Sequence, residues 1–249
     1  MSNYKKIFVV AGHGEGYGEK KDPGAVADDG TTERSIAKAV CQNLVAELGE
    51  KAISIGIEND LTLSEKIIEV NAECNAQQLN FKNSLLISVH VDWRGASEGV
   101  GAYYYGDYRP SQHFAQLVIN EVSKIGSRIK KFNRPDTSSR FGRLGIIRDT
   151  RPLTMLLEIG SLRADSNQND GLELLKTERG QRNIAKYAAV GIRKFANWQE
   201  DAIDNEFNFS AIKALQKRII ALSRASRKYP RLKSFLNKMI KKLNTIRGR

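Results

Sequence analysis

Short apolar runs alternate with amphipathic stretches through the first 200 residues, and this alternation constrains the fold more than any other feature. The runs are rich in Ile, Val, Leu and Tyr, and turn residues bound most of them, as is typical of strands. The predicted strands are Ile7–Ala11, Ala52–Ile57, Leu85–His90, Ala102–Tyr105, Leu144–Arg148 and Thr154–Ile159. Helical periodicity lies between them, over Glu33–Leu48, Ser64–Leu79, Ser111–Ile125 and Gln181–Trp198. The pattern predicts an α/β fold in which helices cover a largely parallel or mixed sheet.

Three predicted loops are longer than most connections between such elements. They are Glu15–Gly30, Gly126–Arg143 and Arg163–Gly171. Loops longer than about 12 residues are often functional, although some are only disordered.

The basic residues are concentrated at the carboxyl-terminal end of the chain. The whole chain has a formal net charge of +12, from 40 Lys and Arg against 28 Asp and Glu. Residues 211–249 contain 13 of the basic residues and no acidic one, which leaves 27 basic and 28 acidic residues in 1–210, a net charge of −1. This division predicts a neutral domain over 1–200, a linker over 201–210 and a basic amphipathic helical hairpin over 211–249.

The sequence offers no signal for export and no disulfide framework. No window approaches the ~18 consecutive apolar residues of a membrane-spanning helix. The run Ile7–Ala11 is too short for a signal peptide and leads into Gly12-His13-Gly14 rather than a cleavage site. Cys41 and Cys74 fit neither a disulfide framework nor a zinc-finger spacing. We therefore expect synthesis in the cytoplasm without a signal peptide.

Polar residues with metal-binding or acid–base chemistry follow three of the predicted strands. His13 lies just beyond the first strand, His90 ends the third, and Glu158 lies near the end of the last. Ligands of open α/β sheets bind outside the carboxyl ends of the strands, so these side chains could converge. Two imidazoles and one carboxylate are a common zinc-binding set that leaves a coordination position for water.

Each of these residues also has an ordinary structural explanation. A single histidine at a strand end is more often a hydrogen-bonded structural residue than a metal ligand. Glu33, which opens the first helix, fits the carboxylate of a capping box. Glu158 is harder to explain in this way, because a carboxylate after Met155-Leu156-Leu157 is costly to bury unless it is paired or functional. His113, in the first turn of a helix, is expected to face solvent.

Six short blocks then follow one another in a fixed order along the chain. They are Ile7–Gly14, Lys21–Val26 with Thr32-Glu33, Leu63–Lys66 with Asn71, Ile87–His90, Leu144–Arg148 before Pro152, and Leu156–Gly160 with Asp165–Asn167, followed by the helix Gln181–Phe195. In this order and spacing they resemble the zinc-dependent N-acetylmuramoyl-L-alanine amidases of the Amidase_3 type. That family includes bacterial cell-separation and sporulation amidases and phage endolysins. The resemblance covers about residues 5–196 and no part of the basic segment.

The resemblance implies a fold, a metal site and a reaction. The family fold is a twisted, mostly parallel sheet flanked by helices. The family's zinc ligands correspond to His13, Glu33 and His90, and its catalytic glutamate corresponds to Glu158. The family cleaves peptidoglycan at the amide between the lactyl group of N-acetylmuramic acid and the L-alanine of the stem peptide. Zinc would activate water and the carbonyl, and Glu158 would accept the water's proton and deliver it to the departing nitrogen.

Some residues depart from the family pattern without replacing a predicted ligand. Lys66 stands where the family often has Arg, Val91-Asp92-Trp93 replaces Ala-Asn-Ala, and Gly160-Ser161-Leu162 replaces a Gly-Phe-hydrophobic run. These differences affect the expected substrate contacts rather than the expected activity. Asp22 and Asn71 either support the zinc site and its loops or have ordinary turn and packing roles.

Three roles are open for residues 211–249. They could form a solvated hairpin, an anchor for anionic envelope polymers or lipid headgroups, or a nucleic-acid-binding segment. Nucleic acid is the least favoured partner, because Tyr229 and Phe235 form no stacking platform.

The sequence as a whole predicts a zinc-dependent peptidoglycan amidase. Because no export signal is found, a phage or prophage endolysin is the expected origin, acting on the cell wall after release through a membrane pore. The alternatives are a zinc peptidase acting on stem peptides and a non-catalytic protein that binds cell wall or nucleic acid.

Overall fold

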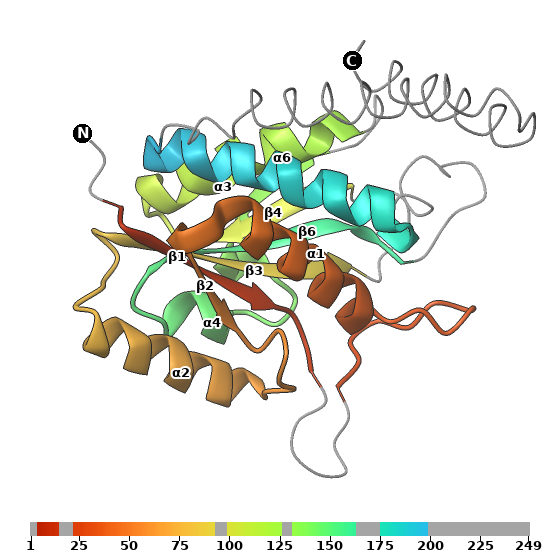
Figure 1. The fold of residues 1–249 in the computed structure, drawn as a ribbon, viewed down its shortest axis with the longest axis horizontal. Coiled ribbons are helices and arrows are strands. Elements are labelled where there is room, and N and C mark those ends of the chain that lie inside the picture. The colour runs from red at the N-terminus through yellow and green to blue at the C-terminus, as the bar shows by residue number, and fades with distance from the viewer. Residues whose placement is uncertain (1–3, 15–21, 93–98, 126–130, 163–174, 199–249) are drawn as a thin grey trace, which may run out of the picture. The chain divides into compact units, whose positions relative to one another are not determined.

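In the computed structural model, a six-stranded sheet with the strand order β2-β1-β3-β6-β4-β5 lies between two helical layers (Figure 1). The strands are β1 (Lys6–Ala11), β2 (Ala52–Ile55), β3 (Ser84–Asp92), β4 (Val100–Tyr104), β5 (Lys131–Pro135) and β6 (Leu153–Ser161). Strands β2, β1, β3 and β6 run parallel, whereas β4 is antiparallel to β6 and parallel to β5. The predicted α/β class with a mostly parallel sheet is confirmed.

The structure describes residues 4–14, 22–92, 99–125, 131–162 and 175–198. The described residues belong to one compact unit, Met1–Trp198. Residues 201–210 and 211–249, with the predicted linker and helical hairpin, lie outside the described residues and stay predictions. Among the helices that are described, none has the length and apolar character needed to cross a membrane.

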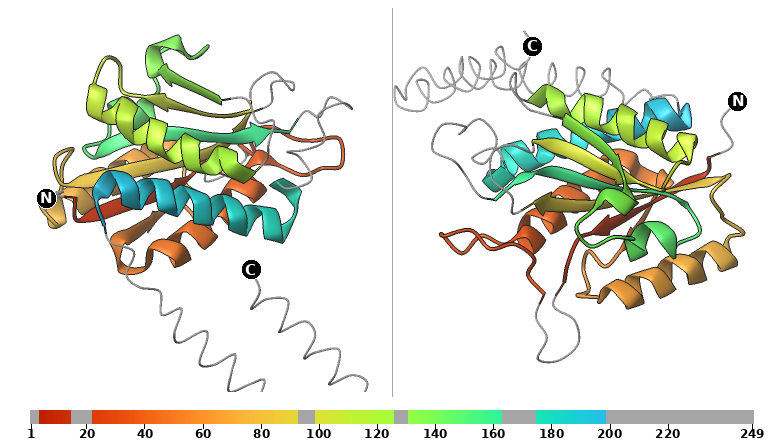
Figure 2. Two further views of the ribbon diagram at one scale, coloured as in Figure 1. Left: turned by 90° about the horizontal axis from the view of Figure 1, so that it is seen from above. Right: turned by 180° about the vertical axis from the view of Figure 1, so that it is seen from behind.

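Helices flank both faces of the sheet, but they cover one face more completely than the other (Figure 2). One face carries α1 (Glu33–Leu48), α3 (Arg109–Val122) and α6 (Glu178–Ala196), which pack with odd-numbered residues of β1 and β3 into the larger core. The other face carries α2 (Leu63–Ala76) and the single turn α4 (Gly145–Arg148), with a smaller core around Phe8, Leu86 and Leu156. This second layer is thin, so it leaves room for a pocket.

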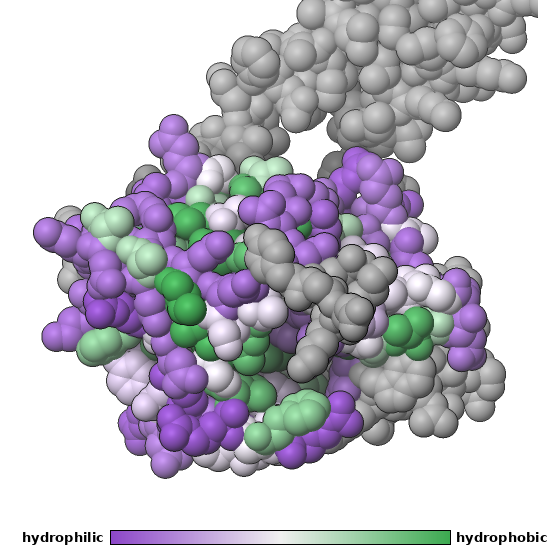
Figure 3. Space-filling model, turned by 90° about the horizontal axis from the view of Figure 1, so that it is seen from below, coloured by the Kyte–Doolittle hydropathy of each residue, from purple (hydrophilic) through white to green (hydrophobic). Residues whose placement is uncertain are grey.

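Helices α1, α2 and α6 each begin after a threonine whose side chain accepts a hydrogen bond from a free amide of the first turn. The side chain of Thr32 accepts a hydrogen bond from the Ser35 amide and caps α1, while Thr62 and Glu65 form a complete capping box at the start of α2. In the view from below, hydrophilic residues lie over much of the described surface, with apolar residues set among them (Figure 3).

Two sequence predictions for the chain between β4 and β6 are wrong. Leu144–Arg148, predicted as a strand, contains helix α4, because the amides of Ile147 and Arg148 donate to the Leu144 carbonyl at 2.9 and 3.0 Å. Strand β5 lies instead within Gly126–Arg143, for which the sequence predicts a loop. Its sequence, KFNRP, has no apolar alternation because it is a partly exposed edge strand that ends in proline.

A buried ion pair fixes the chain after β5. The carboxylate of Asp136, which is fully buried, accepts hydrogen bonds from Nε and Nη2 of Arg148, both at 2.5 Å, and from the Gly106 amide at 3.0 Å. The Arg148 guanidinium also lies 4.1 Å from the ring centroid of Tyr105. Burial raises the pKa of Asp136, but the bonds from Arg148 and Gly106 outweigh it and hold the pKa below its ordinary value.

Asn71 of α2 holds the chain that follows α4. Its Nδ2 donates to the Asp149 carbonyl at 2.8 Å, and its Oδ1 accepts from the Arg151 amide at 3.0 Å. In the structure Asn71 therefore supports a loop and makes no hydrogen bond to the histidines among the described residues.

The Asp136–Arg148 pair predicts a pH-dependent stability. In Asp136→Asn the guanidinium of Arg148, whose side chain is only 14% exposed, loses its charged partner, so we expect the free energy of unfolding to fall by about 3 kcal/mol at pH 7. Because the pKa of Asp136 is lower in the folded than in the unfolded chain, its contribution is complete above a pH of ~3.9 and is lost as the pH falls through the folded pKa. Urea denaturation at pH 7 and pH 3 measures both values, and the difference between wild type and variant should be smaller at pH 3.

The matched control is Asp149→Asn, which removes an exposed carboxylate next to Arg148. Its unfolding free energy should stay within about 0.5 kcal/mol of the wild type. Equal stability of Asp136→Asn and wild type at pH 7 would contradict the structural role of the pair.

Candidate metal centre

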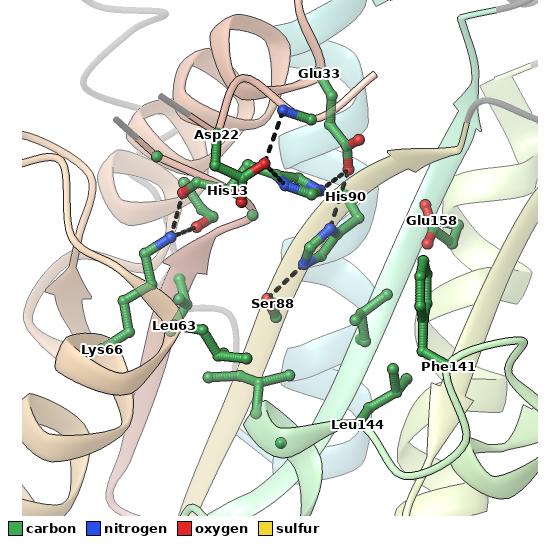
Figure 4. Close-up of a pocket in the computed structure, with 18 of the residues that line it drawn as sticks. His13, Asp22, Glu33, Leu63, Lys66, Ser88, His90, Phe141, Leu144 and Glu158 are labelled. Atoms are coloured by element: carbon green, nitrogen blue, oxygen red, sulfur yellow. Dashed lines mark hydrogen bonds and ion pairs between the residues drawn. The ribbon is translucent and has the colours of Figure 1, made fainter. Parts of the chain in front are cut away.

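His13, Glu33 and His90 come from three elements and meet at the carboxyl ends of β1 and β3 (Figure 4). One possible ligand atom of each residue lies within 4.8 Å of the other two. Oε1 of Glu33 is 3.2 Å from Nε2 of His13 and 3.0 Å from Nδ1 of His90. The three residues predicted from the sequence as metal ligands are thus brought together by the fold.

His13 is held in place from both sides. Its backbone has a positive φ of 55°, which a histidine adopts only at some cost in free energy. The buried Nζ of Lys66 stabilises this turn by donating to the carbonyls of Ala11, at 2.8 Å, and of His13. On the ring, Nδ1 is 2.9 Å from Oδ1 of Asp22, which leaves Nε2 directed at Glu33. Asp22 therefore orients the imidazole, as carboxylates behind metal-binding histidines do.

Glu33 is the first residue of α1, and its side chain is 7% exposed. It does not serve as a capping-box carboxylate, since Thr32 caps the helix alone and the Glu33 carboxylate faces the sheet edge. Its Oε2 accepts from the Ala25 amide and its Oε1 from the Val91 amide, both at 3.0 Å. A Cβ on Gly24, where φ is +69°, would come within 2.6 Å of Oε2, so the loop must have glycine there.

The charges of the cluster favour an ionised Glu33. Burial raises the pKa of this carboxyl, but the hydrogen bonds and charges of His13 and His90 outweigh it and leave the pKa well below its usual range. Burial lowers the pKa of His90, and its bond with Glu33 offsets this only in part. Burial also lowers the pKa of His13, but Glu33 and Asp22 reverse that shift and leave the pKa raised.

Glu158 lies beside the cluster on the neighbouring strand. It is the residue of β6 in register with His90 of β3, and in-register residues of parallel strands face the same side of the sheet. Both side chains are half-buried, and both line a pocket of about 780 Å³ together with His13 and Glu33. On the far side of the His90 ring, Nε2 is 3.2 Å from Oγ of Ser88.

The pocket lies on the thinly covered face of the sheet. Its floor includes the apolar residues Val10 and Leu156, and one wall is the start of α2 at Leu61–Leu63. The opposite wall is the chain just before α4, from which Phe141 points into the pocket toward Glu158 (Figure 4).

The cluster fits a single tetrahedral metal ion. Bonds of about 2.0–2.1 Å in a tetrahedral Zn²⁺ site place neighbouring ligand atoms about 3.3 Å apart. The two distances from Glu33 to the histidines, 3.2 and 3.0 Å, are close to that value. Two imidazole nitrogens and one carboxylate oxygen would also leave a fourth coordination position for water.

A sequence model of the N-acetylmuramoyl-L-alanine amidase family, Amidase_3, matches residues 7–194. The chain belongs to this family. It is therefore an amidase that hydrolyses peptidoglycan, as the resemblance of its six blocks implies. Comparison with curated proteins gave no match.

Solved amidase structures share the fold of this amidase. The catalytic domain of CwlV from Bacillus (Paenibacillus) polymyxa var. colistinus is 22% identical, with a TM-score of 0.59 over 78% of this chain and 99% of that one. AmiC2 of Nostoc punctiforme is 19% identical, with a TM-score of 0.59 over 79% and 99%. The catalytic domain of the CD27L endolysin targeting Clostridia difficile is 17% identical, with a TM-score of 0.56 over 77% and 98%.

The structure also places the remaining residues that the sequence singled out. His113 is exposed, as predicted, while Cys41 and Cys74 are buried free thiols. Burial lowers the pKa of Lys66 to about 8, and nearby Arg34 adds to the shift. The contact of Lys66 with backbone carbonyls was not predicted, although a lysine within a helix that faces the sheet is a signal for a buried cation. No pattern in the sequence predicted the ion pair between Asp136 and Arg148.

The close packing of Gly12 against His90 leads to a prediction. A Cβ at Gly12 would come within 2.6 Å of both Cε1 and Nδ1 of His90 and 2.7 Å of the Val89 carbonyl. In Gly12→Ala the His90 ring must turn or the strand end must move, so we expect metal-ion affinity to fall 10- to 100-fold. Competition titration with a chromogenic chelator measures the change.

Gly145→Ala serves as its control. Its new methyl group would meet neighbours at 3.4 Å or more, which is ordinary contact, and metal-ion affinity should not change. If Gly12→Ala bound the metal ion with wild-type affinity, the position of the His90 ring would not depend on the absence of a side chain at Gly12.

Proposed function

We propose that His13, Glu33 and His90 hold one Zn²⁺ and that Glu158 is the general base and acid of amide hydrolysis. The observation that carries this proposal is the register of β3 and β6, which sets Glu158 beside His90 on the wall of the same pocket. The bond cleaved is the amide between N-acetylmuramic acid and the L-alanine of the stem peptide. When bound, the ion supplies Lewis acidity, which polarises a carbonyl and lowers the pKa of water towards ~7.

The chain's own residues divide the work around the scissile amide. Glu33 contributes negative charge to the metal set, and Asp22 fixes the ring of His13 through Nδ1. The carboxylate of Glu158 accepts a proton from the attacking water and returns it to the alanine nitrogen, which would otherwise leave as a poor anion. The apolar floor of the pocket excludes water from the rest of the substrate and strengthens these charge interactions.

This assignment is tested by separating metal binding from turnover. Glu158→Gln should retain one equivalent of zinc and lose activity on a soluble muropeptide by about 10³-fold or more, because it removes the proton carrier. His90→Ala should lose both zinc and activity. Elemental analysis and chromatography of the products give the two readings.

The same products distinguish the amidase from a zinc peptidase. Amidase cleavage gives a glycan with a free lactyl carboxylate and a peptide that begins with L-alanine, whereas a peptidase cuts between amino acids. Turnover by Glu158→Gln at the wild-type rate would rule out its role as proton carrier. Loss of zinc in that variant would instead make Glu158 a ligand.

We further propose that the protein is a lysin whose residues 211–249 bind anionic polymers or lipid headgroups of the envelope. The similarity of the fold to an endolysin catalytic domain supports the first part. The 13 basic and no acidic residues of 211–249 support the second. Such a protein is made in the cytoplasm and reaches the cell wall after the membrane has been opened.

Deletion of 211–249 separates anchoring from catalysis. We expect the shortened chain to hydrolyse a soluble muropeptide at the full-length rate but to sediment less with purified sacculi at low salt, with the difference shrinking as salt rises. Cells that express the full-length chain should lyse only after their membrane is permeabilised. Equal sedimentation of both chains would contradict anchoring, and lysis of intact cells would contradict release through a pore.

A further inference from the structure

The chain just before α4 forms one wall of the pocket. The proposed reaction gives the residues of this wall no role. Residues 139–141 and 143–146 line the pocket opposite the start of α2. Phe141 is 71% exposed, and Leu63 on the opposite wall is 52% exposed. Ligand pockets are lined mainly by apolar and aromatic side chains, so this rim is suited to cover part of a substrate.

This wall is held rigidly at both ends. Asp136 and Arg148 form the buried ion pair on its two flanks, and Asn71 holds the chain beyond α4. Within the wall, the Phe141 amide donates to Oγ of Ser139 at 3.2 Å. A wall fixed in this way can position a ligand group without a large cost in conformational entropy.

Acidic and basic side chains line different parts of the pocket. The acidic residues of the cluster and Glu158 line the end with the histidines, whereas Arg140 and Arg143 line the wall before α4. The guanidinium of Arg140 stacks on Phe141, 4.5 Å from the ring centroid. Arg143 is exposed, and no hydrogen bond or ion pair joins it to another residue in the described part of the chain. Among the described residues, its guanidinium is thus left available to a ligand in the pocket that it lines.

The substrate of an amidase carries its negative charge on one side of the scissile bond. The glycan side has no ionised group there while the lactyl carboxyl is held in the amide. The peptide side carries carboxylates, and the nearest is the α-carboxylate of the second residue, a glutamate linked through its side chain. Arginine is the side chain best suited to bind a carboxylate, through two parallel hydrogen bonds.

We propose that Arg143 is a specificity residue that binds the α-carboxylate of the second stem-peptide residue, while Phe141 covers the peptide chain beside it. The peptide then leaves the metal end along the wall before α4, and the glycan lies on the other side. This inference rests on the proposed amidase reaction and adds the direction and charge preference of the substrate.

Two muropeptides that differ in one group test this assignment. One carries the free α-carboxylate on its second residue, and the other carries the neutral amide in its place. Wild type should cleave the carboxylate substrate with a kcat/KM roughly 10- to 100-fold higher. Arg143→Gln should lose that advantage, mainly through KM, and should cleave the amidated substrate as wild type does. Arg143→Lys should recover part of the advantage, since it keeps the charge but loses the paired geometry.

Two further variants distinguish the effect of the charge of Arg143 from that of the apolar contact of Phe141. Phe141→Ala should raise KM for both muropeptides alike, because the ring contacts the chain rather than the carboxylate. Arg179→Gln, which removes an exposed arginine that does not line the pocket, should leave both substrates unaffected. Calorimetric titration of the two muropeptides into Glu158→Gln, with and without Arg143→Gln, gives a readout that needs no turnover.

The outcomes distinguish this inference from the reaction on which it rests. Equal loss on both substrates in Arg143→Gln, or no loss on either, would overturn the carboxylate contact while leaving the amidase reaction intact. Cleavage of neither muropeptide by wild type would overturn the reaction and the inference together.

Discussion

The carboxylate of Glu33 is the interaction on which the site depends. It is buried, it opens α1, and it joins two histidines from different strand ends to the amides of Ala25 and Val91. Its position at the start of α1 places it where the partial positive charge of the helix favours an anion. Because four groups converge on it, His13, the chain at Ala25, the first helix and the end of β3 are fixed relative to one another.

The unequal covering of the sheet explains why this cluster opens into a pocket. Three helices pack on one face, and there the odd-numbered residues of β1 and β3 form a continuous core. On the other face α2 and the single turn α4 cover only part of the sheet. His90 and Glu158 lie on this second face at the ends of their strands, where a substrate can reach them. The pocket thus has an apolar floor, an acidic end that suits a metal ion, and a basic wall.

The sequence predicted the elements whose apolar pattern is strong. The central strands and the four long helices have that pattern because they are buried on one or both sides. Strand β5 and helix α4 were missed for the opposite reasons. KFNRP lies at an edge and needs no apolar alternation, whereas the run around Ile146 and Ile147 is short enough to be either strand or helical turn. Two tertiary contacts decided between a strand and a helical turn at Ile146 and Ile147. They are the ion pair of Arg148 with Asp136 and the hydrogen bond of Asn71 to the chain that follows α4.

For the site, the sequence by itself determined which chemical groups are available and that each stands at the end of an element. It placed His13 just after a strand, His90 and Glu158 near the ends of strands and Glu33 at the start of a helix, and the order of the blocks matched one enzyme family. Only the tertiary structure decided that Glu33 faces the histidines instead of capping its own helix, that Lys66 supports the turn at His13, and that Arg143 lines the pocket with no polar partner among the described residues. The physical reason is that local pattern reports whether a side chain is buried, whereas its partner depends on strand order and register, which bring residues far apart in the chain to within hydrogen-bonding distance.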